Sequence, residues 1–467
     1  MSLLANGISM FLGMLAVIVL PKYLSLEQYG LYQLYLLYVG FTAMLALGVP
    51  EGIYLALGGK KKVDVDRRDV RFQFSLLAVL DLLVFFVIAL FTCLTESDEL
   101  RRATLLWVVL SGLINCVRNY PLFVLQATGK IREYSISVIL ERVISIVPIV
   151  TMVCIGFSNI TFLLFFDVFG RAVSFVYVMA AFVKLDSGLF SDCCSDDVSV
   201  FTKLRAFLSQ TQSGFQLMIA SYASTAIIGI ARIGVEEGWE FALFAQISLV
   251  ISIANMLTRL INAVAIPIFP MLKDLSVSAI KVLYRNASFV ITLAFLLLNV
   301  FVQPLVQVLA WWVPNYSEAL GYVALLVPMC LFESKTAVLV MSLCKSLRRE
   351  EILFAINVTS IALAALGTML CVIFSDGIAT LLVFLVVIMG VRCFAGEMYL
   401  YRTFSFRSDG AIIWDVVISC GICIVWCMRP SLLSVSNVMV PVLFSIANRK
   451  KILSIANNFW DMKRSSR

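Results

Sequence analysis

Charged side chains within long apolar stretches are the residues of this sequence that could do chemistry. An ionised side chain at bilayer depth costs at least about 2.5–3.5 kcal/mol, so it faces a water-filled cavity or a partner of opposite charge. The candidate cations are Arg118, Arg142, Arg171, Arg259, Lys335 and Arg392. The candidate acids are Glu51, Asp81, Glu141, Asp167, Glu333, Glu397 and Asp415. Cations combined with amides and hydroxyls suit a ligand that carries phosphate charges and sugar hydroxyls.

Arg118 has the most polar surroundings of these candidates. Helical periodicity over 104–127 places a polar stripe on its face. That stripe contains Ser111, Asn115, Asn119 and Gln126. Pro121, three residues on, locally opens the backbone hydrogen bonding of the predicted helix. Substrate binding by Arg118, Asn115 and Asn119 is favoured over a stripe that only packs helices together, because Arg with two Asn is more polar than packing requires.

A second polar stripe follows the predicted helix 241–267. Its members are Ser248, Ser252, Asn255, Arg259 and Asn262. Arg259 and Asn255 either line a binding cavity, or Arg259 extends its guanidinium to water at the cytoplasmic end. Lys335 joins the candidate binding residues because it corresponds to Arg118 in an internal repeat, although Glu333 lies only two residues away. Arg392 joins them because it lies inside an apolar span, where it either lines a cavity or pairs with another helix.

The buried acids have a separate candidate role in ion coupling. That set is Glu51, Asp81, Asp167, Glu333 and Glu397. Asp167 and Arg171 are four residues apart with the acid first, which favours an ion pair within one helix over direct substrate binding, although Arg171 stays a binding candidate. Glu141 and Arg142 are interpreted as interfacial anchors. No metal site or cofactor is expected, because the chain has no His and its cysteines lack zinc-site spacing.

The composition requires a membrane protein. Hydrophobic residues make up 61% of the 467 residues, charged residues only 14%, and the mean hydropathy is +0.98. The net charge of +7 does not indicate nucleic acid binding, because the cations lie in short loops between apolar spans. Fourteen helical spans are predicted. They lie near 3–20, 31–57, 72–94, 104–127, 136–156, 160–183, 205–231, 241–267, 286–310, 319–343, 352–374, 377–401, 411–428 and 432–447. The fold class is therefore all-α, and no signal peptide is expected ahead of the first span.

The loops between these spans predict the orientation. Loops on one side contain 25 Lys and Arg residues, whereas those on the other side contain five. Because positive loops stay in the cytoplasm, both termini are expected there.

An internal repeat with an offset of 217 residues predicts two related halves. Arg118 matches Lys335, and Thr151–Ser158 matches Thr368–Ser375 with five identities in eight positions. We therefore expect an N-terminal lobe of six helices (1–184), a cytoplasmic loop (185–204) and a second six-helix lobe (205–402). Two further helices (403–447) and a basic cytoplasmic tail (448–467) follow.

Three short stretches have a recognisable pattern: Pro21-Lys22-Tyr23-Leu24-Ser25-Leu26-Glu27-Gln28-Tyr29-Gly30-Leu31-Tyr32, Leu47-Gly48-Val49-Pro50 and Ile266-Pro267-Ile268-Phe269-Pro270-Met271-Leu272-Lys273. In these stretches the sequence resembles the polysaccharide-exporter branch of the MOP flippase superfamily. It implies two six-helix lobes around a central cavity, alternating access and no enzymatic activity. It also implies a substrate, an undecaprenyl-diphosphate-linked oligosaccharide such as an O-antigen unit, moved across the bacterial inner membrane. A polymerase and a chain-length regulator of the same pathway are further partners that it implies.

Three other functions stay open from the sequence alone. A cation-coupled drug exporter of the same superfamily would need buried acids without matching cations, and here the two roughly balance. A lipid II flippase would be expected to have a basic first helix, which is absent. A non-transporting membrane component or a polymerase is the third, and the short loops opposite the basic side disfavour a polymerase.

Overall fold

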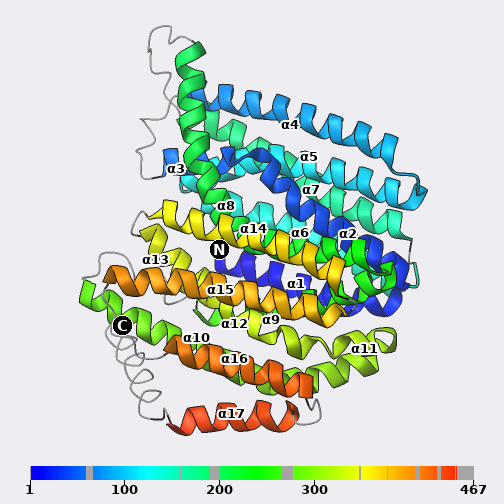
Figure 1. Cartoon of the computed structure of the whole chain (residues 1–467). Coiled ribbons are helices and arrows are strands. Elements are labelled where there is room, and N and C mark those ends of the chain that lie inside the picture. Colours follow the sequence, from blue (N-terminus) through cyan, green and yellow to red (C-terminus); the bar gives the residue numbers. More distant parts are fainter. Residues whose placement is uncertain are drawn as a thin grey trace. The chain divides into compact units, whose positions relative to one another are not determined.

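The structure is a computed structural model, shown in Figure 1. It describes residues 2–58, 67–157, 159–189, 200–265, 277–346, 349–375, 377–404, 411–428, 433–447 and 449. All regular secondary structure in these ranges is helical, which confirms the all-α prediction. Half of the expected loop 185–204, the Ile266–Lys273 stretch and nearly all of the basic tail lie outside the described residues.

The chain forms two compact units. Unit 1 comprises residues 1–232 and 239–248, and unit 2 comprises 233–238 and 249–467. The helices of the first half are α1 Ser2–Tyr23, α2 Leu26–Thr42, η1 Ala43–Ala46, α3 Val49–Leu57, α4 Arg67–Thr95, α5 Glu99–Ala127, α6 Ile131–Cys154, α7 Ile160–Leu189 and α8 Val200–Gly238. Those of the second half are α9 Phe241–Ala265, α10 Val277–Trp312, η4 Pro314–Tyr316, α11 Ser317–Leu320, α12 Val323–Lys335, η5 Thr336–Val340, α13 Met341–Ser346, α14 Glu350–Phe374, α15 Ile378–Phe404, α16 Ala411–Met428 and α17 Leu433–Ala447.

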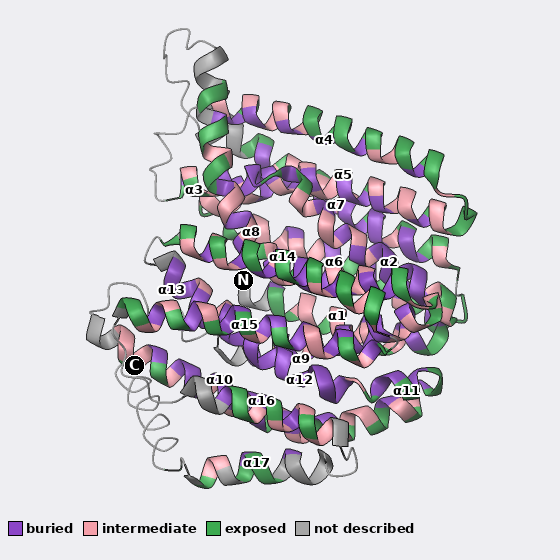
Figure 2. Ribbon diagram, viewed as in Figure 1, coloured by how far each residue is buried: buried purple, intermediate pink, exposed green. Residues whose placement is uncertain are grey.

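Many of these helices are long and apolar enough to cross a membrane. Within the described ranges there are 11 of them, and the bent pair α2–α3 raises the number to 12. The predicted count of fourteen is not confirmed, because the described apolar part of α16, Asp415–Trp426, is short and α17 has 15 residues. Figure 2 shows α4 largely exposed along one side. Its exposed residues include Val79, Leu82, Phe86, Val87, Phe91 and Leu94, a surface suited to lipid.

Helix α2 begins within the Pro21–Tyr32 stretch, which carries part of the family resemblance. Ser25 caps this helix by accepting a hydrogen bond from the backbone N–H of Gln28, whose side chain accepts from Ser25 N in return. At its other end the span breaks. Leu47 and Gly48 have φ values of +50° and +78°, and α3 leaves at an angle of 55° to the preceding segment. Glycine suits this left-handed position because it has no Cβ.

Three glycines let the backbones of α3 and α8 touch within unit 1. A Cβ added to Gly52 would lie 2.5 Å from the carbonyl oxygen of Gln210, and one added to Gly214 would meet Gly48 O. Small residues at such crossings allow helices in membranes to pack closely. Gly48 at the N-cap of α3 and Gly52 within α3 therefore allow α8 to pack closely against this part of unit 1.

Gly214→Val is expected to destabilise unit 1, because its side chain would occupy the space of the α3 backbone. Overpacking typically costs about 1–3 kcal/mol, and a rigid backbone leaves no room for relaxation. The aggregation temperature of the purified protein in detergent measures the effect. Gly421→Val is the control, since a Cβ at Gly421 has no heavy atom within 4 Å. Equal aggregation temperatures for the two variants would contradict the close crossing.

In unit 2, α12 continues into a five-residue π-helical segment, η5, directly after Lys335. The Ser342 hydroxyl donates a hydrogen bond to the carbonyl of Ala337, five residues earlier, at 3.3 Å. The helix thus accommodates a wider turn beside a candidate binding residue, as π-bulges often do at functional sites.

Candidate functional site

Four charged side chains from α5, α6 and α7 meet inside unit 1. We call Arg118, Glu141, Asp167 and Arg171 the arginine cluster. Arg118 Nη1 donates to Glu141 Oε2 and also to Ser174 Oγ at 3.0 Å. Its Nη2 donates to Asn115 Oδ1 at 3.1 Å, so Asn115 on the same helix orients the guanidinium.

Arg171 binds the same glutamate from the other side. Its Nη1 lies 3.7 Å from Glu141 Oε1, and its Nε donates to Asp167 Oδ2 at 2.8 Å. Tyr35 on α2 donates its hydroxyl proton to Asp167 Oδ2 at 2.7 Å. The four charged residues are only 4–7% exposed, and their two cations balance their two carboxylates. Glu141 is thus a carboxylate shared by two buried guanidinium groups.

The arrangement is suited to binding an anion. Guanidinium groups bind carboxylate and phosphate oxygens with the same paired geometry. Phosphate oxygens that approached Arg118 and Arg171 would therefore compete with Glu141 for the same donors. The hydroxyls of Ser137 and Ser174, 2.8 Å apart, lie beside the cluster and could bond a polar ligand.

Sequence reasoning placed Arg118 and Asn115 together but misjudged Glu141. The structure buries Glu141 between two arginines, whereas interfacial anchoring was expected. A signal was available, because Ser137, Glu141 and Ser145 are spaced by four on α6 and share a face. Asn119 is half-buried and makes no described hydrogen bond to Arg118.

A second group of buried charges lies in unit 2. We call Lys335, Asp415 and Glu397 the lysine cluster. Lys335 Nζ contacts Asp415 Oδ2 and donates to Ser288 Oγ at 2.9 Å. Thr292 donates to Asp415 Oδ1 at 3.0 Å. Tyr284 donates to Glu397 Oε1 at 2.8 Å. Lys335 is 1% exposed. Lys335 and Arg118, which correspond in the internal repeat, are therefore both buried cations, and each contacts an acid.

The remaining candidates are distributed over other helices. Arg392 is buried; its Nη1 lies 3.3 Å from Glu333 Oε2, and its Nε donates to Asn357 Oδ1 at 2.8 Å. This is pairing between helices, one of the two roles that the sequence left open. Arg259 on α9 is exposed and Asn255 is half-buried. Among the described residues, no group of three or more His, Cys, Asp or Glu could hold a metal ion.

Comparison with known proteins relates the chain to transporters by fold. No family model and no curated protein sequence matches it. Its structure is similar to that of lipid II flippase MurJ in the inward closed conformation, with a TM-score of 0.66 and 13% identity over 96% of this chain and 99% of that one. It is also similar to a multidrug resistance MATE family transporter of the MOP superfamily, inward-facing, with a TM-score of 0.57 and 12% identity over 90% of this chain and 94% of that one. An outward-facing multidrug resistance MATE family transporter of the MOP superfamily is also similar, with a TM-score of 0.52 and 15% identity over 90% of this chain and 96% of that one. The chain therefore has the multi-pass helical fold shared by MOP-superfamily transporters, as expected from the resemblance.

Proposed function

We propose that this chain is a flippase for a lipid-linked oligosaccharide. Its substrate is an undecaprenyl-diphosphate-linked sugar unit, such as an O-antigen repeat, moved by alternating access from the cytoplasmic to the periplasmic leaflet of the bacterial inner membrane. Similarity in fold to a lipid II flippase along almost the whole chain supports this class of substrate. The six-plus-six lobes with cytoplasmic termini belong to the same proposal.

The observation that carries the proposal is Glu141 shared between Arg118 and Arg171. A diphosphate brings at least two negative charges, and each guanidinium can offer paired N–H donors to it. In the absence of substrate, Glu141 and Asp167 together neutralise the two cations inside the bilayer. Substrate phosphates take its place, while Asn115 and Ser174 bond the adjoining polar groups. Lys335, Arg392 and Arg259 are proposed to receive the substrate in unit 2.

Complementation tests the proposal. A bacterium that lacks its own oligosaccharide flippase is supplied with this chain and with candidate sugar clusters. Restored surface polysaccharide is expected, and exchanging the clusters gives the substrate range. Lipid-linked sugar that stays in the inner leaflet, despite good amounts of this protein in the membrane, would contradict the proposal.

A cation-coupled exporter of small molecules is the second candidate. Similarity to MATE transporters supports it, as does the burial of Glu51 and Asp81, two acids of unit 1 that no described basic side chain pairs with. Cation-driven efflux of dyes from cells that express the chain, without restored polysaccharide, distinguishes this function from flipping.

A further inference from the structure

We propose that Asp81 and Glu51 form a proton-binding site inside unit 1, beside the break between α2 and α3. In transport, the proton would be the coupling ion, and this role rests on the proposed function. Proton binding itself can be measured on the purified protein whatever that protein transports.

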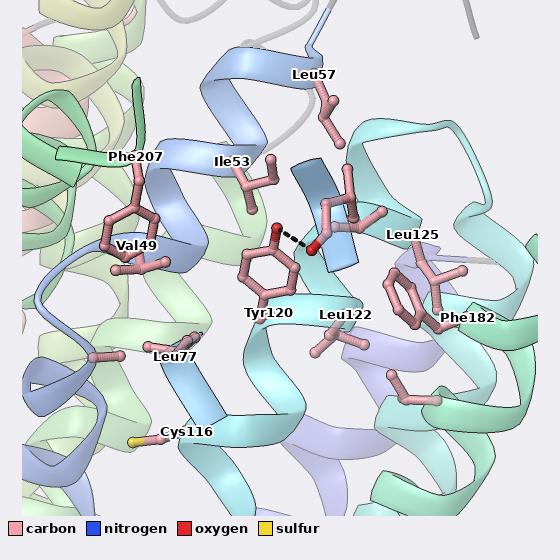
Figure 3. Close-up of a cluster of buried hydrophobic side chains, with 14 of the residues drawn as sticks. Val49, Ile53, Leu57, Leu77, Cys116, Tyr120, Leu122, Leu125, Phe182 and Phe207 are labelled. Carbon is pink, nitrogen blue, oxygen red and sulfur yellow. Dashed lines mark hydrogen bonds between the residues drawn. The ribbon is translucent and has the colours of Figure 1, made fainter. Parts of the chain in front are cut away.

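Asp81 lies within apolar surroundings. It is 3% exposed, and its Oδ2 atom has no hydrogen-bond partner among the described residues. Leu77 and Phe85, one turn before and after it on α4, both belong to a buried apolar cluster that Figure 3 shows around Tyr120. In that cluster the drawn hydrogen bond joins Tyr120 Oη to the carbonyl of Val70, at 3.2 Å. An ionised carboxylate without a partner is costly there, whereas a neutral carboxylic acid is tolerated.

Glu51 reaches the same region from α3. It is 6% exposed, and both Glu51 and Asp81 act electrostatically on the Cys116 thiol of α5. Cys116 in turn donates to the carbonyl of Thr42, the last residue of α2, at 3.1 Å. A Cβ on Gly112 would lie 2.6 Å from both Thr42 Cγ2 and Phe85 Cε1, so α2, α4 and α5 meet closely at this point.

The groups that surround the two carboxyls supply no positive charge. From α5 the titratable neighbour is Cys116, and from α8 it is Tyr222, on which Glu51 acts. Arg118 also acts on Tyr222, but no described basic side chain acts on Glu51 or Asp81. A proton can neutralise such a site. A metal cation would need a ring of oxygen ligands, and Asp81 is instead bracketed by apolar side chains.

The other candidate coupling acids differ in this respect. Asp167 is ion-paired with Arg171, and Glu333 with Arg392. Glu397 lies in the field of Lys335 and accepts a hydrogen bond from Tyr284. Among the five candidate acids, Asp81 and Glu51 are thus the two on which no described basic side chain acts. This distinction selects them from the five acids.

Infrared difference spectroscopy tests proton binding directly. The full chain, reconstituted in lipid, is titrated with pH and the carbonyl stretch of protonated carboxylic acids is recorded. We expect a band that persists at neutral pH, that shrinks in Asp81→Asn and in Glu51→Gln, and that is lost in the double variant. Glu99→Gln is the matched control, because Glu99 is an exposed acid at the start of α5. Elution of each variant as a monodisperse peak shows that it is folded.

Two results would overturn the inference. One is a neutral-pH band that is unchanged in the double variant. The other is a band that is absent at neutral pH while added sodium shifts the spectrum, which would assign the site to a metal cation. In the complementation strain, Asp81→Asn should lose restored polysaccharide and Glu99→Gln should keep it. Failure of the unsubstituted chain to complement would contradict the proposed flippase but leave the infrared result standing.

Discussion

Arg118→Ala should abolish transport while the protein still reaches the membrane. The substitution removes a guanidinium that binds Glu141, Ser174 and Asn115. A hydrogen bond to a charged group contributes about 1.5–3 kcal/mol. Each 1.4 kcal/mol is tenfold in affinity, so binding of the diphosphate should weaken about 10- to 100-fold. Surface polysaccharide in the complementation strain measures the loss, and Arg118→Lys should retain part of the activity because it keeps the charge.

A double substitution separates binding from folding. In Arg118→Met/Glu141→Leu both charges leave together, and replacing a buried ion pair by apolar residues is often neutral for stability. If Arg118 binds substrate, the double variant is as stable as the unsubstituted protein and still inactive. Recovery of transport in the double variant would show that Arg118 serves only to neutralise Glu141.

Lys335→Met should strongly destabilise unit 2. Lys335 is 1% exposed, and without it Asp415 loses its contacting cation while Glu397 loses the nearest positive field. Removing one partner of a buried ion pair costs about 3–5 kcal/mol, because the other charge stays buried and uncompensated. The aggregation temperature of the Lys335→Met protein in detergent is expected to be far below that of the unsubstituted protein.

Two variants control this experiment. Lys335→Met/Asp415→Leu should recover part of the lost stability, since the contacting pair leaves as a unit while Glu397 still lacks Lys335. Arg402→Met should change little, because Arg402 is exposed in the last turn of α15. A Lys335→Met protein as stable as the unsubstituted chain would contradict a buried lysine cluster.

Periodicity in the sequence predicts contacts within one helix but not those between helices. The spacing of Asp167 and Arg171 indicates the ion pair seen on α7, and the stripe around Arg118 indicates its bond to Asn115. Hydropathy likewise predicts the all-helical fold. These features depend on residues three or four positions apart, which helical geometry alone brings together.

The partners that cross between helices could not be predicted in this way. Glu141 meets Arg118 across 23 positions, and Tyr35 meets Asp167 across 132. Because Glu141 and Arg142 lie only about a turn and a half into their predicted span, the sequence favoured an anchor at the interface. The predicted count of fourteen spans is not confirmed, because hydropathy alone does not give helix length and the described α17 has 15 residues, fewer than the roughly 20 that usually cross a membrane.

The π-helical segment at 336–340 affects how the residues after it are assigned to helix faces. A π turn contains one more residue than an α turn, and each residue of an α-helix rotates the face by about 100°. A helical wheel drawn without a break from Lys335 to Ser346 therefore misplaces α13 by about one residue. Ser342, seven positions after Lys335, would share its face in a regular helix. Across η5 that relation no longer holds, so Ser342 and Lys335 are not assigned to one face.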